Sequence, residues 1–180
     1  PPDYDAHQRP WYLLGMETPG AIRWSSPYKE AVTEEMVIST VKTIADPETG
    51  RPLGVLAMDI SLVDLERIMD NIYLPEGGNL FLVHDDGSLL VSTCSNTECI
   101  GFIQNLMQGG DPADSSSYHQ VNNEDAFLNM TRIAATDWTL FFLVPQDTLL
   151  AAIDPIKTGT IIAALVLMIL FLFALFLVDH

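Results

Sequence analysis

Basic residues are scarce in this sequence. Its 180 residues include 8 lysines and arginines against 24 aspartates and glutamates, so the formal net charge is −16 at pH 7. Nucleic-acid binding needs a basic face that neutralises phosphates, and anionic lipid headgroups likewise attract basic segments. The composition therefore predicts no nucleic-acid partner, and a strongly acidic surface mainly favours solubility.

Cysteines and catalytic motifs are also few. Cys94 and Cys99 are the only cysteines, in the turn-prone segment TCSNTEC, and four scattered histidines supply no zinc-ligand set. The sequence has no GxSxG elbow and no phosphate-binding loop. We therefore expect no metal, no cofactor and no enzyme within this chain. A local disulfide between the two cysteines in an oxidising compartment is the interpretation we favour, with two free thiols as the alternative.

Long apolar runs are absent except at one place. Residues 160–178 (TIIAALVLMILFLFALFLV) carry no charge, and a helix of that length would be roughly 28 Å long, close to the hydrocarbon core of a bilayer. Residues 156–180 are therefore expected to form a juxtamembrane segment and one transmembrane helix, with a cleaved lipid-anchor signal as the alternative. The favoured disulfide and the acidic composition place residues 1–156 outside the cytoplasm, at the plasma or inner membrane.

Alternating β-branched residues predict strands in the first half of the chain. Residues 36–45 (MVISTVKTIA) and 53–60 (LGVLAMDI) flank the turn-rich segment DPETGRP, which predicts a hairpin. Residues 21–27 indicate a further strand. Residues 61–72 predict an amphipathic helix with Ser61 as its N-cap.

A second set of elements follows the segment LPEGG at 74–78, the best candidate for a module boundary. Strands that pass directly into amphipathic helices predict an α+β fold with antiparallel sheets and flanking helices. We expect two modules, 1–74 and 75–155, of which the first has fewer elements and is N-terminally truncated. The expected elements of the second are a hairpin over 79–93, a helix over 102–108, a loop over 109–117, strands over 126–135 and 138–144, and a helix that starts near 145.

The segment DYDAHQRPWY places one of the few cations among aromatic residues. Pro10 disfavours the helical conformation at Arg9, and residues two apart in an extended chain point to the same side. Arg9 and Trp11 could therefore face one pocket, where the planar guanidinium matches a carboxylate. The alternative is an arginine that stacks on aromatic rings and holds a loop.

Asp59 is the natural counterpart of that arginine. It lies in an otherwise apolar strand, LGVLAMDI, where an acid is costly unless it is paired or at the strand end. It could accept hydrogen bonds from a ligand ammonium. The alternative is that Asp59 caps the following helix beside Ser61.

These residues together resemble a known family. The pattern resembles that of the double Cache sensor domains, and it consists of Tyr4, Arg9-Pro10-Trp11-Tyr12, Tyr28 in SSPY and Asp59 in GVLAMDIS. These domains are extracytoplasmic modules of bacterial chemoreceptors, sensor histidine kinases and cyclic-dinucleotide enzymes. Relatives occur in calcium-channel α2δ subunits. The resemblance covers residues 1–155. It implies two stacked PAS-like modules on a long N-terminal helix. This sequence departs from the family pattern at its N-terminus, where we find no counterpart of the long helix and the first strands.

The same pattern is similar to the subset that binds α-amino acids. The resemblance implies that Arg9 and Trp11 hold the ligand carboxylate, and that Asp59 holds the ammonium. It also implies that hydroxyls of Tyr4, Tyr12 or Tyr28 assist Asp59. The protein is then a transmembrane signalling receptor, with a homodimer expected at full length. The alternatives are a membrane-anchored interaction subunit and a sensor for amines or another small metabolite.

Overall fold

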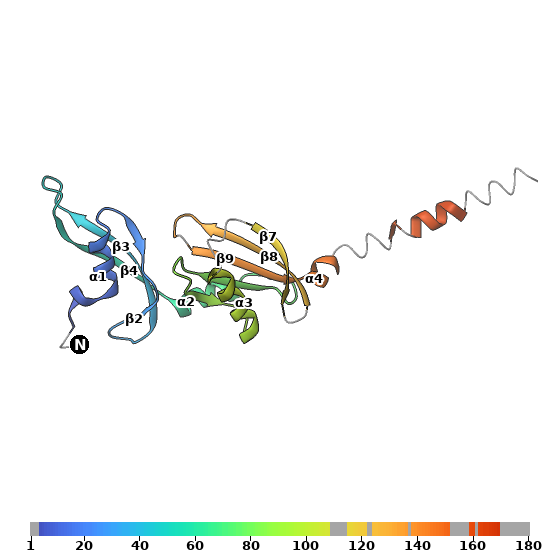
Figure 1. The fold of residues 1–180 in the computed structure, drawn as a ribbon, viewed down its shortest axis with the longest axis horizontal. Coiled ribbons are helices and arrows are strands. Elements are labelled where there is room, and N and C mark those ends of the chain that lie inside the picture. Colours follow the sequence, from blue (N-terminus) through green and yellow to red (C-terminus); the bar gives the residue numbers. More distant parts are fainter. Residues whose placement is uncertain are drawn as a thin grey trace, which may run out of the picture.

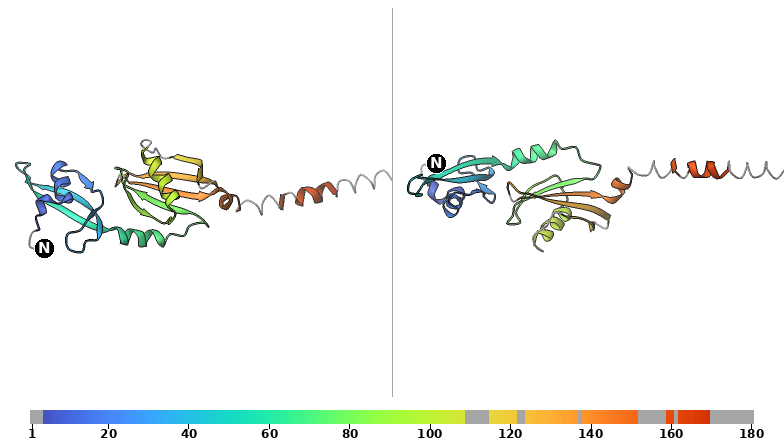
Figure 2. Two further views of the ribbon diagram at one scale, coloured as in Figure 1. Left: turned by 60° about the horizontal axis from the view of Figure 1, so that its bottom comes forward. Right: turned by 90° about the horizontal axis from the view of Figure 1, so that it is seen from above.

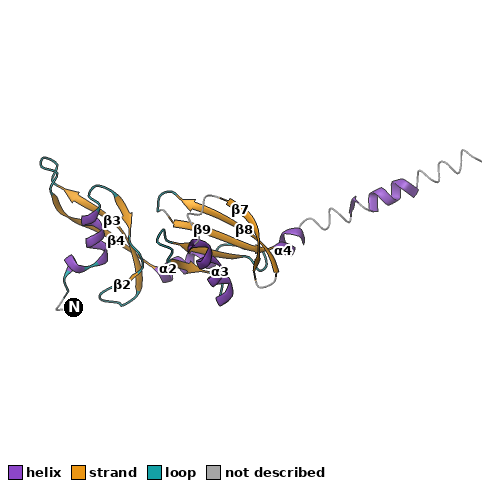
Figure 3. Ribbon diagram, viewed as in Figure 1, coloured by secondary structure: helices purple, strands orange, loops and turns teal. Residues whose placement is uncertain are grey.

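The computed structural model describes residues 4–108, 115–121, 124–136, 138–151, 159–160 and 162–169. Two antiparallel sheets follow one another along the chain, and helices lie beside them (Figures 1 and 3). Helix α2 (Leu62–Asp70) runs from the end of the first sheet toward the second (Figure 2). The predicted α+β class is therefore confirmed.

Strand β3 (Met36–Ala45) is the central strand of the first sheet. From Val37 to its end it pairs with β4 (Pro52–Ser61), as the predicted hairpin requires. The other edge of β3 pairs with two short strands, β1 (Ile22–Trp24) and β2 (Tyr28–Lys29). The single strand expected over 21–27 is thus two strands, because Ser25–Pro27 leave the ladder between them.

Helix α1 (Pro10–Glu17) covers one face of this sheet, and the extended conformation expected for this segment is wrong beyond Arg9. Arg9 is extended (φ −82°, ψ 145°), as a residue before proline should be, but Pro10 begins a helix. Proline suits this first helical position because its missing N–H would have no partner there. A 3₁₀ turn, η1 (Ala6–Gln8), precedes it.

The close contact of α1 with the sheet depends on Gly15. This glycine is buried, and a Cβ built on it would lie 2.4 Å from a methyl carbon of Val55 on β4. The Thr43 hydroxyl on β3 also donates a hydrogen bond to the Gly15 carbonyl. The helix backbone therefore packs directly on the two long strands.

The second sheet has five strands in the order β6-β5-β9-β8-β7. The predicted hairpin and the last two strands are confirmed, whereas part of the expected loop over 109–117 belongs to strand β7. Helix α3 is longer at its start than expected, because Asn96 accepts a hydrogen bond from the Glu98 N–H and begins the helix before the apolar run. The elements are β5 (Asn79–Val83), β6 (Leu89–Ser92), α3 (Thr97–Gln108), β7 (Ser115–Val121), β8 (Glu124–Ile133), β9 (Trp138–Pro145) and α4 (Gln146–Ala151).

The two sheets share part of their apolar packing. Ile38 on β3 is fully buried in one cluster with residues of the second sheet, among them Leu82 and Trp138. The Trp24 and Trp138 rings meet edge to face with their centres 4.7 Å apart. Ser61 caps α2 as predicted, by accepting a hydrogen bond from the Val63 N–H. The helix leads the chain across this shared core.

The predicted transmembrane segment lies mostly outside the described residues. Within it, residues 162–169 are helical. In the part of the chain that the structure describes, no helix has the length and apolar character needed to span a bilayer.

Gly15→Ala should destabilise the protein, because the added methyl group would overlap Val55. Overpacking of this kind costs about 1–3 kcal/mol, which outweighs the roughly 1 kcal/mol by which alanine favours a helix. Gly101→Ala in α3 is the matched control, since its Cβ would meet no atom within 4 Å, and it should be neutral or stabilising. Urea unfolding measures both, and equal effects would contradict the close contact.

Candidate functional site

Arg9 lies at the N-terminal end of α1, where Pro10 fixes its extended backbone. Its guanidinium carbon lies 5.4 Å from the centre of the Tyr28 ring, within cation–π range. One of its N–H groups also donates to the Lys29 carbonyl. The stacking alternative is therefore realised in part, because the arginine rests on a tyrosine of β2.

Asp59 forms the other end of the site. The Ser39 hydroxyl donates to Asp59 Oδ1 at 2.5 Å, and the Tyr28 hydroxyl reaches the same oxygen at 3.3 Å. The Tyr28 and Ser39 hydroxyl oxygens are themselves 2.5 Å apart. Asp59 thus accepts from two hydroxyls, and the helix-capping alternative is wrong, because Ser61 caps α2.

The sheet register brings these groups together. Ser39 and Asp59 lie directly opposite each other on β3 and β4. Because side chains alternate across a strand, they share a face with Thr43 and Val55, which contact α1. The site therefore occupies the part of this face that lies beside the beginning of the helix.

Tyr28 separates the two charges. Burial raises its pKa above the ordinary value, and the Asp59 carboxylate raises it further, whereas the Ser39 hydrogen bond and Arg9 act in the opposite direction. The hydroxyl therefore stays protonated and donates at neutral pH. The guanidinium lies over the ring of the same side chain whose hydroxyl meets the carboxylate.

Three predicted site residues are not joined to this group. Trp11 is the second residue of α1 and meets Tyr12 edge to face at 5.6 Å, and Tyr12 in turn meets His7 at 4.7 Å. Tyr4 is 46% exposed. Among the described residues, no hydrogen bond joins Asp59 to any of these three side chains. The predicted pairing of Arg9 and Trp11 by alternation fails, because a helix replaces the extended chain.

Ser39 was missed by the sequence reasoning. It is fully buried and links Tyr28 to Asp59. Its place between Val37 and Val41 in the alternating run of β3 was an available signal, since a hydroxyl on an inward row with apolar neighbours requires a partner.

A chain of hydrogen bonds leads from this site to the second sheet. Ser25 and Ser39 are joined twice: the Ser25 N–H donates to the Ser39 carbonyl, and the Ser39 N–H donates to the Ser25 hydroxyl, both at 2.9 Å. The next residue, Ser26, donates to Asp86 at 2.5 Å. Asp86 lies in the β5–β6 turn, 3.2 Å from the ring nitrogen of the buried His84. One short segment thus contacts both the site and the β5–β6 turn of the second sheet.

Asp86 is held in its ionised form. Burial opposes this, but hydrogen bonds from Ser26 and Ser88, together with His84, lower its pKa to about 2. The contact between the modules is therefore charge-assisted at neutral pH.

The two cysteines are free thiols in the structure, so the favoured disulfide is not formed in it. Cys94 Sγ lies 3.4 Å from the Asn96 N–H, which donates to it. Cys99 is buried, and burial together with the neighbouring Cys94 raises its pKa to about 12. The Cys99 thiol is therefore protonated at neutral pH.

The chain forms two antiparallel sheets in succession, and the last strand of each in chain order passes directly into a helix. This arrangement defines a tandem PAS-like α+β protein. The Cache domain family matches residues 1–153, and the chain belongs to that family.

Relatives with curated descriptions are chemotaxis receptors. The chain is 27% identical over 168 residues to the methyl-accepting chemotaxis protein McpC of Bacillus subtilis, which covers 93% of this chain and 25% of that protein. It is 27% identical over 173 residues to PctB of Pseudomonas aeruginosa, with 92% and 27% covered. The chain spans about a quarter of the length of these relatives.

Solved structures show the same architecture. The ligand-binding domain of the Pseudomonas fluorescens chemoreceptor CtaA in complex with L-alanine has a TM-score of 0.59 at 26% identity, with 82% of this chain and 64% of that chain covered. The ligand-binding domain of Mlp24 with asparagine has a TM-score of 0.63 at 19% identity, with 84% of this chain and 62% of that chain covered. At this identity the similarity shows a common fold.

Asp59→Asn should lower the pKa of Tyr28, because it removes the negative charge that opposes ionisation of the hydroxyl. Burial remains, so only part of the shift is lost. A pH titration of the tyrosine ring ¹³C resonances measures it, with Asp64→Asn on the exposed side of α2 as the control. An unchanged Tyr28 pKa in Asp59→Asn would contradict the contact between the two side chains.

Removal of the Asp86 carboxylate should destabilise the protein less at acidic pH than at neutral pH. Its pKa in the folded protein lies below the usual unfolded value of about 3.9, so its contribution to stability is present above pH 4 and is lost as the pH falls toward 2. The difference in unfolding free energy between the wild type and Asp86→Asn should therefore shrink from pH 6 to pH 2.5. The exposed Glu48→Gln serves as the control, and a difference that grows in acid would contradict this assignment.

Proposed function

We propose that this chain is the extracytoplasmic ligand-sensing region of a transmembrane chemoreceptor, and that its first module binds a free α-amino acid. The observation that carries the proposal is the arrangement of Arg9 and Asp59 at the two ends of one tyrosine. A zwitterion requires a cationic group for its carboxylate and an acid for its ammonium. The L-alanine bound to the related CtaA domain supports the same ligand class.

In this proposal the guanidinium of Arg9 binds the ligand carboxylate. Its planar fork can donate to two carboxylate oxygens, although one N–H already donates to the Lys29 carbonyl. Trp11, Tyr12 and Tyr4 come from the same segment and form the wall around the carboxylate end. Closure of this segment over a ligand would bring them nearer to Asp59.

Asp59 binds the ligand ammonium. Ser39 and Tyr28 hold Asp59 Oδ1, so the ammonium binds Asp59 Oδ2. The Tyr28 hydroxyl can rotate from the carboxylate to the ligand without a change of charge, because its raised pKa keeps it protonated.

The remaining parts of the receptor follow from the sequence and the family. Residues 1–74 form the distal module, 75–155 the proximal module, and 156–180 a juxtamembrane segment and transmembrane helix. Residues 1–156 lie outside the cytoplasm, and the complete receptor is a homodimer. A ligand shifts signalling only through its different affinities for the two receptor states.

Calorimetric titration with an α-amino acid and two blocked analogues tests the site. In the wild type, the methyl ester loses the carboxylate charge and the N-acetyl derivative loses the ammonium, so both should bind at least tenfold more weakly than the free amino acid. Removing one partner of a desolvated charge pair costs about 2–5 kcal/mol, which corresponds to roughly thirtyfold or more.

Two variants assign the ends of the ligand. Arg9→Gln should lower the affinity for the free amino acid at least tenfold and leave the affinity for the methyl ester unchanged. Asp59→Asn should also lower the affinity for the free amino acid at least tenfold, and it should leave the affinity for the N-acetyl derivative unchanged. The exposed Arg51→Gln is the matched control for charge removal. Equal binding of the ester and the free amino acid in the wild type would instead identify an amine sensor. Wild-type affinity in Arg9→Gln would disprove the carboxylate role.

A further inference from the structure

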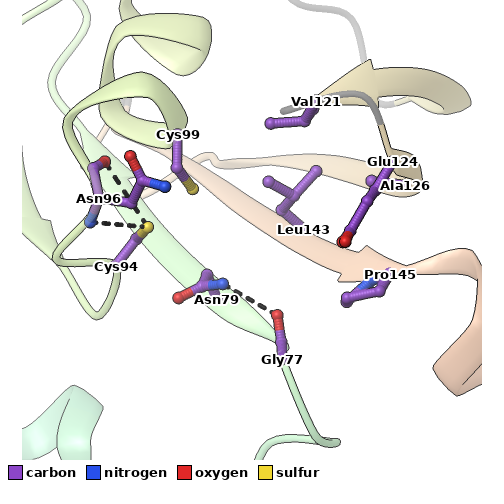
Figure 4. A pocket seen from close by; sticks show the side chains of 10 residues that line it. All are labelled: Gly77, Asn79, Cys94, Asn96, Cys99, Val121, Glu124, Ala126, Leu143 and Pro145. Atoms are coloured by element: carbon purple, nitrogen blue, oxygen red, sulfur yellow. Dashed lines mark hydrogen bonds between the residues drawn. The ribbon is translucent and has the colours of Figure 1, made fainter.

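A cavity of about 240 Å³ lies in the second module, between its sheet and the start of α3. Cys94 and Cys99 line one side, and Val121, Ala126 and Leu143 line the other. Figure 4 shows the Cys99 sulfur and the side chains of Val121 and Leu143 pointing toward a common space. The proposed amino-acid site uses none of these residues.

The cavity occupies the place in its module that the charged site occupies in the first. Strands β4 and β9 each pass directly into a helix, and Asp59 and Leu143 each lie two residues before the last residue of their strand. Their partners correspond as well, because Ser39 faces Asp59 as Leu128 faces Leu143. The two sheets therefore present equivalent positions with different side chains.

The helix on that face corresponds too. Arg9 directly precedes α1, and Asn96 directly precedes α3. Asn96 caps its helix, with its side-chain oxygen accepting from the Glu98 N–H at 2.9 Å. In the second module, an amide thus replaces the arginine and a leucine replaces the aspartate. Among the described residues that line the cavity, the carboxylate end of a zwitterion has no cationic partner.

The lining chemistry fits an apolar occupant. Leu143 and Ala126 are 5% exposed, and Cys99 is 4% exposed. The raised pKa of Cys99 keeps its thiol uncharged. An apolar cavity of about 150 Å³ suffices to bind benzene, so this larger space accommodates a six-membered ring with a substituent. The Asn79 and Glu124 side chains also border the cavity and can accept one hydrogen bond from that substituent.

We propose that the second module holds a separate binding site, between β9 and the start of α3, for a small neutral molecule that has an apolar body and one hydroxyl group. The ligand body lies against Val121, Ala126 and Leu143, and its hydroxyl donates to Asn79 or Glu124. A carboxylate-bearing ligand is rejected, because none of the described residues that line the cavity is a cation and Glu124 is negative.

Phenol and benzoate are the matched probes, since they share a ring and differ in charge. Calorimetric titration of the 180-residue chain should show saturable phenol binding, and benzoate should bind at least tenfold more weakly. A phenol signal that does not saturate, or equal affinity for the two probes, would overturn the proposal.

Ala126→Leu fills the cavity and should raise the phenol Kd at least tenfold. Ala135→Leu, in the exposed β8–β9 turn, is the control and should leave it unchanged. If Ala126→Leu fails to fold, alkylation of Cys99 by iodoacetamide in the wild type gives a second measurement, because bound phenol should slow it at least threefold. Unchanged phenol affinity in a folded Ala126→Leu, or unprotected Cys99, would disprove the site.

The distal variants keep this test independent of the amino-acid proposal. Arg9→Gln and Asp59→Asn should leave the phenol Kd within twofold of wild type, whether or not an amino acid binds to the first module. Loss of phenol binding in Asp59→Asn would place phenol at the distal site and would overturn the second site alone.

Discussion

The pairing of Asp59 with two hydroxyl groups is the interaction on which the first module depends. The Asp59 carboxylate is exposed, whereas the Ser39 side chain is fully buried, and a buried hydroxyl without a partner is costly. The carboxylate has two hydroxyl donors. Ser39 supplies one from the opposite strand and Tyr28 supplies the other. The same tyrosine supports Arg9 on its ring, so one side chain positions both charges of the site.

This arrangement also connects the site to the rest of the molecule. Ser39 is held by Ser25 through two hydrogen bonds, and Ser26 then contacts Asp86 of the second module. A displacement of Tyr28 or Ser39 by a ligand would act on a segment only a few residues long. Because Asp86 accepts as a carboxylate with a pKa of about 2, this contact persists over the whole physiological pH range. The route is therefore short and insensitive to protonation.

The two modules show how one framework carries different chemistry. Each has a central hairpin, a helix on one face and a final strand that leads into another helix. Strand β9 pairs on both sides, whereas β4 pairs with β3 alone among the described residues. At equivalent positions of the face below the helix, the first sheet has a carboxylate and a hydroxyl group, and the second has two leucines. The fold fixes where a ligand could lie, and a few side chains decide its class.

Local patterns in the sequence determined the long strands, the hairpins and the capped helix after Ser61, because alternation and capping act over a few residues. They also identified Asp59 as an acid that needs a partner and Arg9 as a candidate to bind a carboxylate, whereas Tyr28 entered through the resemblance to the Cache family. Only the tertiary structure decided that Pro10 starts a helix, since proline permits both an extended segment and a first helical turn. Trp11 is separated from Asp59 for that reason. The buried Ser39, the contact between Ser26 and Asp86, and the thiol-lined cavity all depend on pairs that are distant in sequence. Strand register and packing bring such pairs together, and no local pattern encodes either.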